Sequence, residues 1–167
     1  MPSSLIYGFS LREMVLKGNL RFHTISVSLM VEWRIKVYME DAFNFINEAF
    51  EEFRRGVREG DYSRIRDAAE KAWNAVVQAS NALILKLAGK VPSSHWERRR
   101  LLRELERRYE EIARLGFRDR YSARERNLHE MVFYEGIIEI EDVEVELEKA
   151  KRYVEDVAKI VGFKLLE

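Results

Sequence analysis

The sequence predicts an all-α protein, folded as an antiparallel helical bundle of about five helices. Past residue 30 the apolar residues recur every three or four positions, which is the period of an amphipathic helix. The 167 residues include only two prolines and eight glycines, a composition that suits long helices. We therefore expect no substantial sheet between residues 35 and 161.

The first two helices are delimited by glycines and by a capping residue. Gly56 and Gly60 help to end the first helix, and Asp61 is expected to cap the start of the second. The second helix stops at Gly89, shortly before Pro92. The apolar face of the first helix consists of Ile35, Met39, Ala42, Ile46, Ala49 and Phe53.

Two capping boxes predict the starts of the third and fourth helices. Ser94 is followed three residues later by Glu97, and this helix should end near Gly116. Ser122 and Glu125 repeat the pattern, so Ser122 is the expected N-cap of a short helix that reaches about residue 134.

A final helix carries a narrow apolar seam and stops at Gly162. The seam consists of Val143, Leu147, Ala150, Val154, Val157 and Val161. A seam this narrow suits a bundle or a partner helix. Because the seam and the short fourth helix both need a cover, we expect a two-fold homodimer.

The domain organisation expected is an N-terminal extension, residues 1–29, followed by one helical domain, residues 30–167. Apolar and polar residues partly alternate in the extension, and Gly18-Asn19 suits a two-residue turn. The extension is therefore either a hairpin or a flexible segment.

Composition excludes several kinds of chemistry. The chain has no cysteine, so disulfides, zinc–thiolate sites and a cysteine nucleophile are ruled out, and a cytoplasmic location is the default expectation. Apolar runs such as Ala82–Leu85 are too short to span a membrane. Three scattered histidines predict no metal site, and no cofactor motif occurs.

The candidate catalytic residues are Arg124 and His129. An imidazole can take the proton of a ribose 2′-hydroxyl, and a guanidinium can form paired hydrogen bonds to a phosphate. Glu125 is a candidate to orient the imidazole and Tyr134 to contact the phosphate. On an ideal helix Arg124 lies about 140° from His129, so Arg126 is the alternative cation. The alternative interpretation is a structural histidine beside a surface arginine.

Charge is unevenly distributed although the whole chain has no net charge. Residues 95–126 contain eleven arginines and seven acidic residues, whereas residues 127–167 contain eleven acidic and five basic residues. Such a basic segment predicts binding of single-stranded RNA, and the alternative is an ordinary solvated helix face. The candidate RNA-binding residues are Arg98, Arg99, Arg103 and Arg120.

These features together resemble the HEPN domain over roughly residues 30–162. The resemblance rests on two long helices, the Gly89, Pro92 and His95 break, an arginine-rich helix, and the Arg124-to-His129 spacing. The segment from residue 127 to residue 136, NLHEMVFYEG, is more narrowly similar to the archaeal PaREP branch.

The resemblance implies a dimerising helical bundle. Active HEPN proteins are metal-independent endoribonucleases of toxin–antitoxin and defence systems, and many are neutralised by a nucleotidyltransferase antitoxin. This chain departs from the usual motif, because Glu125 stands where an asparagine or aspartate often follows the arginine. Two functions are therefore expected as alternatives. One is an RNA-cleaving or RNA-binding protein, and the other is a noncatalytic module that dimerises and binds a nucleotidyltransferase through its last helix.

Overall fold

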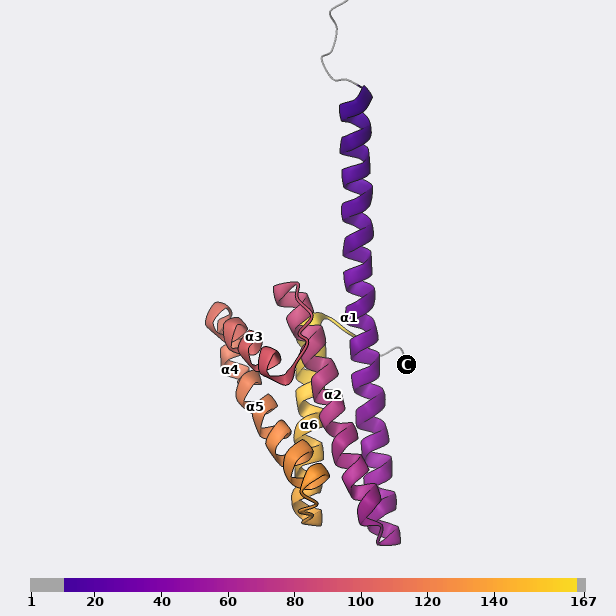
Figure 1. The fold of residues 1–167 in the computed structure, drawn as a ribbon, viewed down its shortest axis with the longest axis vertical. Helices are drawn as coiled ribbons and strands as arrows, with labels where there is room; N and C mark the ends of the chain where they lie inside the picture. Colours follow the sequence, from indigo (N-terminus) through magenta and orange to yellow (C-terminus); the bar gives the residue numbers. More distant parts are fainter. Residues whose placement is uncertain (1–10, 165–167) are drawn as a thin grey trace, which may run out of the picture.

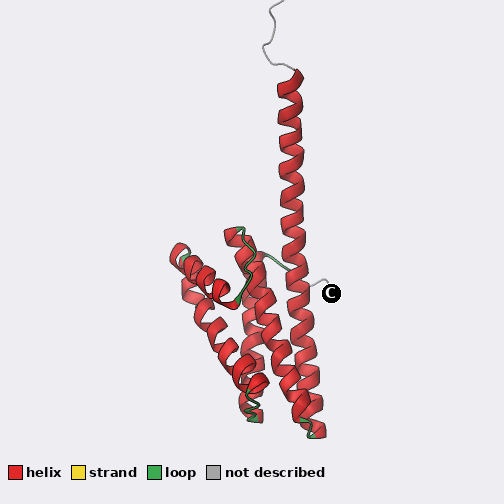
Figure 2. Ribbon diagram, viewed as in Figure 1, coloured by secondary structure: helices red, strands yellow, loops and turns green. Residues whose placement is uncertain are grey.

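The computed structural model describes residues 11–164, with side chains described from residue 26 onward. This part of the chain forms helices and no strand, which confirms the predicted all-α bundle (Figures 1 and 2). The elements are α1 (Leu11–Glu59), α2 (Tyr62–Ala88), α3 (His95–Arg108), α4 (Glu110–Leu115), α5 (Phe117–Arg124), the π-helix η1 (Glu125–Tyr134) and α6 (Ile140–Val161).

Helices α1 and α2 form an antiparallel pair joined by a tight turn. Asp61 caps α2 as predicted, because its carboxylate accepts hydrogen bonds from the amides of Ser63 and Arg64 at 3.0 and 3.2 Å. Gly60 ends α1 with a left-handed φ of 68°. Gly56 does not end the helix. A Cβ there would lie 2.9 Å from the Ile65 side chain, so this glycine allows α2 to approach α1 closely.

Helix α1 is 49 residues long, and its N-terminal part projects beyond the rest of the bundle (Figure 1). The hairpin expected in the N-terminal extension is wrong where the structure describes it, because Gly18 and Asn19 lie inside this helix. Helix α1 also passes through residue 30 without a break. Residues 1–10 of the expected extension lie outside the described part.

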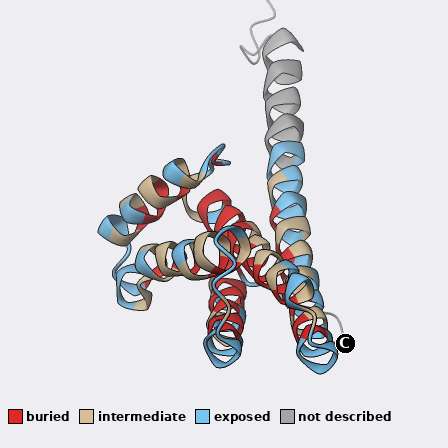
Figure 3. Cartoon of the chain, turned by 60° about the horizontal axis from the view of Figure 1, so that its bottom comes forward, coloured by how far each residue is buried: buried red, intermediate tan, exposed pale blue. Residues whose placement is uncertain are grey.

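The core is centred on α2, which packs against α1, α3, η1 and α6. Figure 3 shows buried residues along the inner faces of these helices. The whole predicted seam of α6 is buried inside the single chain, including Val143 and Val161 at its two ends. Its apolar residues therefore do not need a partner to cover them, which removes one argument for a dimer.

The predicted boundary of the third helix is correct at its start and wrong at its end. The Ser94 hydroxyl accepts a hydrogen bond from the Glu97 amide at 3.1 Å, as an N-cap does. The helix then ends at Arg108, because Tyr109 is extended at φ −129° and ψ 112°, and α4 follows.

None of the helices that the structure describes combines the length and the apolar character that a membrane span requires.

Ser122 is not an N-cap, contrary to the prediction. Helix α5 already begins at Phe117 and continues directly into η1. The Ser122 hydroxyl donates to the Arg118 carbonyl at 2.9 Å, one turn earlier in the same helix. The capping-box pattern therefore lies within a continuous helix.

Candidate functional site

His129 lies on η1 and is held by a carboxylate from α2. Its Nδ1 is 2.7 Å from Oε2 of Glu70. A carboxylate accepts hydrogen bonds, so Nδ1 carries the proton and donates it to Glu70. In the neutral ring this leaves the lone pair on Nε2, which is the arrangement a general base requires.

His95 is the first residue of α3, directly after the Ser94 cap. Its Nδ1 lies 3.1 Å from the Tyr121 hydroxyl and 3.3 Å from Nη1 of Arg98. A guanidinium can only donate, so Nδ1 accepts and the ring proton sits on Nε2. Burial lowers the pKa of His95, the charge of Glu125 opposes this, and the nearby Arg98 lowers the pKa further. The ring is therefore neutral at pH 7 and can donate a hydrogen bond through Nε2.

The rings of His95 and His129 lie side by side, with centroids 5.7 Å apart and planes at 65°. Both rings also pack against the indole of Trp73. Its ring centroid is 5.3 Å from that of His95 and 5.7 Å from that of His129. We call these two residues the histidine pair. His129 can accept a proton at Nε2, and His95 can donate a hydrogen bond from Nε2.

Two aromatic residues from the end of η1 frame His129. Phe133 stacks on it with centroids 6.2 Å apart, and Tyr134 meets it edge-on at 4.8 Å. The predicted supporting residue Tyr134 is 66% exposed, so it lies where the site meets solvent. Nε of Arg66 donates to the Phe133 carbonyl at 2.9 Å, which fixes this end of η1 to α2.

Glu125 does not orient His129, contrary to the expectation. It forms an ion pair with Arg99 of α3 instead. Arg98, the neighbouring arginine, is buried and donates through Nε to Oδ1 of Asn81 at 2.8 Å. Arg98 therefore positions His95 and is not exposed for RNA binding.

Arg124 lies apart from His129, and the two side chains contact different helices. Nε of Arg124 is 2.7 Å from Oε2 of Glu146 on α6, and both residues are buried. This contact is an ion pair between a buried guanidinium and a buried carboxylate. Burial lowers the pKa of Arg124, opposed by the charge of Glu146. The side chain that lies beside His129 is therefore that of His95, whereas Arg124, the predicted partner, contacts α6.

The remaining predicted cations differ in their exposure and in the ion pairs that they form. Arg126 is exposed and pairs with Glu130 at 2.9 Å on its own helix, so it does not replace Arg124 at His129. Arg120 pairs with Asp156 at 2.9 Å and lies over the ring of Tyr153. Arg103 is exposed on α3.

Among the side chains that are described, no cluster of three or more histidine, aspartate or glutamate residues is arranged to hold a metal ion.

His95 is the functional candidate that sequence reasoning missed. The sequence placed His95 only in the break before the third helix, and its contact with His129 spans 34 positions of the chain. The available signal was that His95 and Arg98 lie three positions apart at the start of a helix, where they share a face.

Fold and site together define an all-helical domain in which two helices and a π-helix assemble a histidine pair. The chain belongs to the archaeal PaREP1/PaREP8 family, whose model matches residues 37–154. This confirms the narrower part of the predicted resemblance, whereas the wider HEPN relationship stays a prediction. The chain matches no curated protein and no solved structure.

Proposed function

We propose that this protein cleaves single-stranded RNA by a metal-independent reaction in which the histidine pair acts on one phosphodiester. The observation that carries the proposal is the proximity of the two imidazole rings, whose centroids are 5.7 Å apart. Their hydrogen-bond partners assign the proton to Nδ1 of His129 and to Nε2 of His95. The proposal keeps the predicted role of His129 and replaces Arg124 with His95.

In the proposed reaction Nε2 of His129 takes the proton of a ribose 2′-hydroxyl. The 2′-oxygen attacks phosphorus, the bond to the 5′-oxygen breaks, and a 2′,3′-cyclic phosphate forms. The leaving 5′-oxygen takes its proton from water. Glu70 stabilises the imidazolium that forms on His129. Nε2–H of His95 donates to a phosphate oxygen whose negative charge grows in the transition state.

The test is to incubate the full chain with mixed single-stranded RNA and identify the new ends. We expect cyclic phosphate or 3′-phosphate ends, formed equally well in the presence of a chelator. His129→Ala should lower the rate by at least about a hundredfold, the usual scale for a lost acid–base group. Wild-type protein that leaves all RNA intact, or a folded His129→Ala variant with an undiminished rate, would refute the proposal.

The second candidate is a noncatalytic module that forms homodimers and binds a nucleotidyltransferase, as in a toxin–antitoxin pair. The burial of Arg124 against Glu146 favours it, because this arginine is the one to which the HEPN resemblance assigns catalysis. The projecting part of α1 also exposes Leu29, Met30 and Trp33, each by about two thirds. Light scattering at micromolar concentration tests the dimer, and a stable monomer would contradict it.

A further inference from the structure

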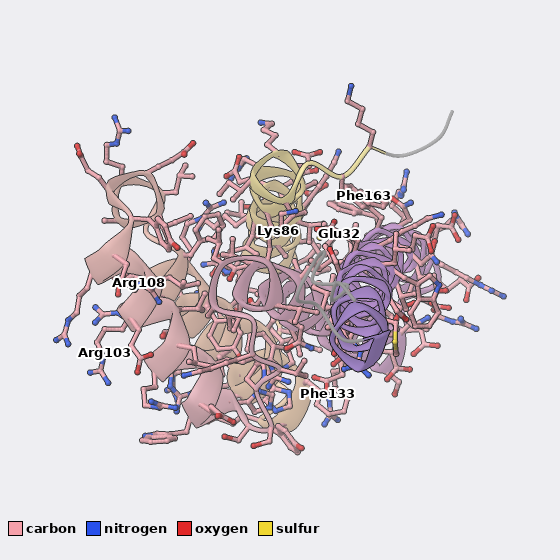
Figure 4. All side chains as sticks on the ribbon, turned by 90° about the horizontal axis from the view of Figure 1, so that it is seen from above. Glu32, Lys86, Arg103, Arg108, Phe133 and Phe163 are labelled. Atoms are coloured by element: carbon pink, nitrogen blue, oxygen red, sulfur yellow. The ribbon has the colours of Figure 1, made fainter. Side chains whose placement is uncertain are left out.

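A basic groove of about 330 Å³ lies between α3 and α5. These helices are on the side of α2 away from α1 (Figures 1 and 4). The groove is lined by one aromatic residue, four cations, one acid and one hydroxyl residue, which are Trp96, Arg99, Arg100, Arg103, Arg118, Asp119 and Ser122. We call it the α3–α5 groove. Its size is at the lower end of the range for pockets that hold small molecules.

Most of this lining comes from one stripe of α3. Positions 96, 99, 100 and 103 follow the three-and-four spacing that places side chains on one helix face. The opposite face carries Leu101, Leu102 and Leu105, which are buried in the core. The fold therefore fixes the basic stripe toward solvent.

Trp96 is the unusual member of the stripe because its large indole is 64% exposed. The guanidinium of Arg100 lies over it, 5.6 Å from the ring centroid. An exposed indole beside cations is the combination with which proteins bind unpaired bases, by stacking and by attraction of the backbone.

The cations of the groove are not all neutralised within the chain. Arg100 pairs with Glu104 at 2.8 Å, and Arg118 pairs with Asp119 at 2.7 Å. Arg103, by contrast, makes no ion pair with any side chain described, and Figure 4 shows it on the α3 side of the bundle. Arg103 is thus the cation most available to a phosphate.

We infer that the α3–α5 groove binds one nucleotide of single-stranded RNA, with the base stacked on Trp96 and the adjoining phosphate at Arg103. The inference rests on the proposed function, because it assigns a binding subsite for the same substrate. Arg99 links the two places, since it lines the groove and pairs with Glu125, the first residue of the π-helix η1 that carries His129.

The test measures binding of a 2′-O-methyl oligo(A) of about ten nucleotides, a length within the usual range for single-strand sites. This oligonucleotide lacks the 2′-hydroxyl, so the wild-type chain cannot cleave it by the proposed reaction. Trp96→Ala should weaken binding at least about fivefold, as expected for one lost stacking contact. Trp33→Ala is the matched control, because Trp33 is 65% exposed on α1. It should bind as the wild type does.

A second pair of variants tests the phosphate contact. Arg103→Glu should weaken binding and reduce the salt dependence by about one counterion. Arg58→Glu, the same charge change at an exposed position on α1, should do neither. An abasic oligonucleotide of equal length should still respond to Arg103→Glu and not to Trp96→Ala.

Equal affinity of Trp96→Ala and Trp33→Ala, or of Arg103→Glu and Arg58→Glu, would overturn the inference. The outcome is separate from that of the proposed function. Loss of cleavage in His129→Ala with unchanged binding by the groove variants would refute the groove alone. Groove-dependent binding without any cleavage by the wild type would refute the reaction alone.

Discussion

Nε of Arg124 lies 2.7 Å from Oε2 of Glu146 in the interior of the bundle, where the two residues are only 5% and 8% exposed. Nζ of Lys149 reaches the other oxygen of the same carboxylate at 2.7 Å. A buried charge that loses its partner is strongly destabilising, whereas replacing a whole buried pair with apolar groups is often neutral. Arg124 therefore joins α5 to α6, and we expect its role to be structural.

We predict that Arg124→Ala lowers the free energy of unfolding by roughly 3 kcal/mol, because Glu146 stays buried with only Lys149 beside it. The alternative interpretation of the sequence made Arg124 a surface arginine, whereas the structure buries it. Arg124→Met combined with Glu146→Leu should recover most of the loss. Urea unfolding of the three proteins measures both effects. A single variant as stable as the wild type would show that the pair contributes little.

The Arg124→Met, Glu146→Leu variant also separates structure from catalysis. If Arg124 acts only through the fold, this folded variant should cleave RNA at nearly the wild-type rate. A rate reduced a hundredfold in a variant of normal stability would return Arg124 to the catalytic residues.

Glu70 is predicted to act through His129. Glu70→Gln preserves the shape of the side chain but removes the charge that stabilises the imidazolium, so cleavage should slow by on the order of a hundredfold. Binding of the 2′-O-methyl oligonucleotide should not change. Glu130→Gln on η1 is the control, because Glu130 pairs with Arg126 on the exposed side of the helix. Equal cleavage rates in the two variants would contradict the role of Glu70.

His95 should make the fold sensitive to acid. Its pKa in the folded chain is lowered from the ordinary value near 6.5, chiefly by burial. The unfolded chain therefore binds this proton more readily, and the stability held above about pH 6.5 is lost as the pH falls toward the lowered pKa. In His95→Gln the free energy of unfolding should fall less steeply below about pH 6.5. Urea unfolding across this range measures the slope, and identical slopes would refute the assignment.

Tyr153 and Ser80 form a buried hydrogen-bond chain between α6 and α2. The Ser80 hydroxyl donates to the Val76 carbonyl at 2.7 Å, so the Tyr153 hydroxyl, 2.6 Å away, is the donor to Ser80. Tyr153→Phe should therefore lower the free energy of unfolding by about 1 kcal/mol, the usual value for one hydrogen bond. Thermal unfolding followed by circular dichroism tests this, with no change expected in RNA cleavage.

The sequence predicted correctly those helix ends that are determined by residues within one turn. Asp61, Ser94 and Gly162 were correctly assigned to helix ends, since a cap is defined by residues within one turn. The Ser122 pattern was equally local, but a helix that had already begun at Phe117 overrode it. The break at Tyr109 had no glycine or proline to reveal it.

The candidate site was predicted only in part because its contacts join distant segments. His129 was identified, but its partner Glu70 lies 59 positions away and no helical period connects the two. The angle calculated between Arg124 and His129 assumed an ordinary α-helix. In η1 the amide of Glu135 instead bonds the carbonyl of Glu130, five residues back, at 2.9 Å. The faces deduced for an ideal helix therefore do not apply there.

The central claim is that His95 and His129 act together on one phosphodiester. Single-turnover cleavage rates of the wild type, His95→Ala, His129→Ala and the double variant test it most directly, with circular dichroism to confirm folding. We predict that each single change lowers the rate by at least about tenfold and that the double variant is no slower than the slower single variant, because residues that act as a unit are non-additive. A folded His95→Ala variant that cleaves at the wild-type rate, or fully additive losses in the double variant, would contradict the claim.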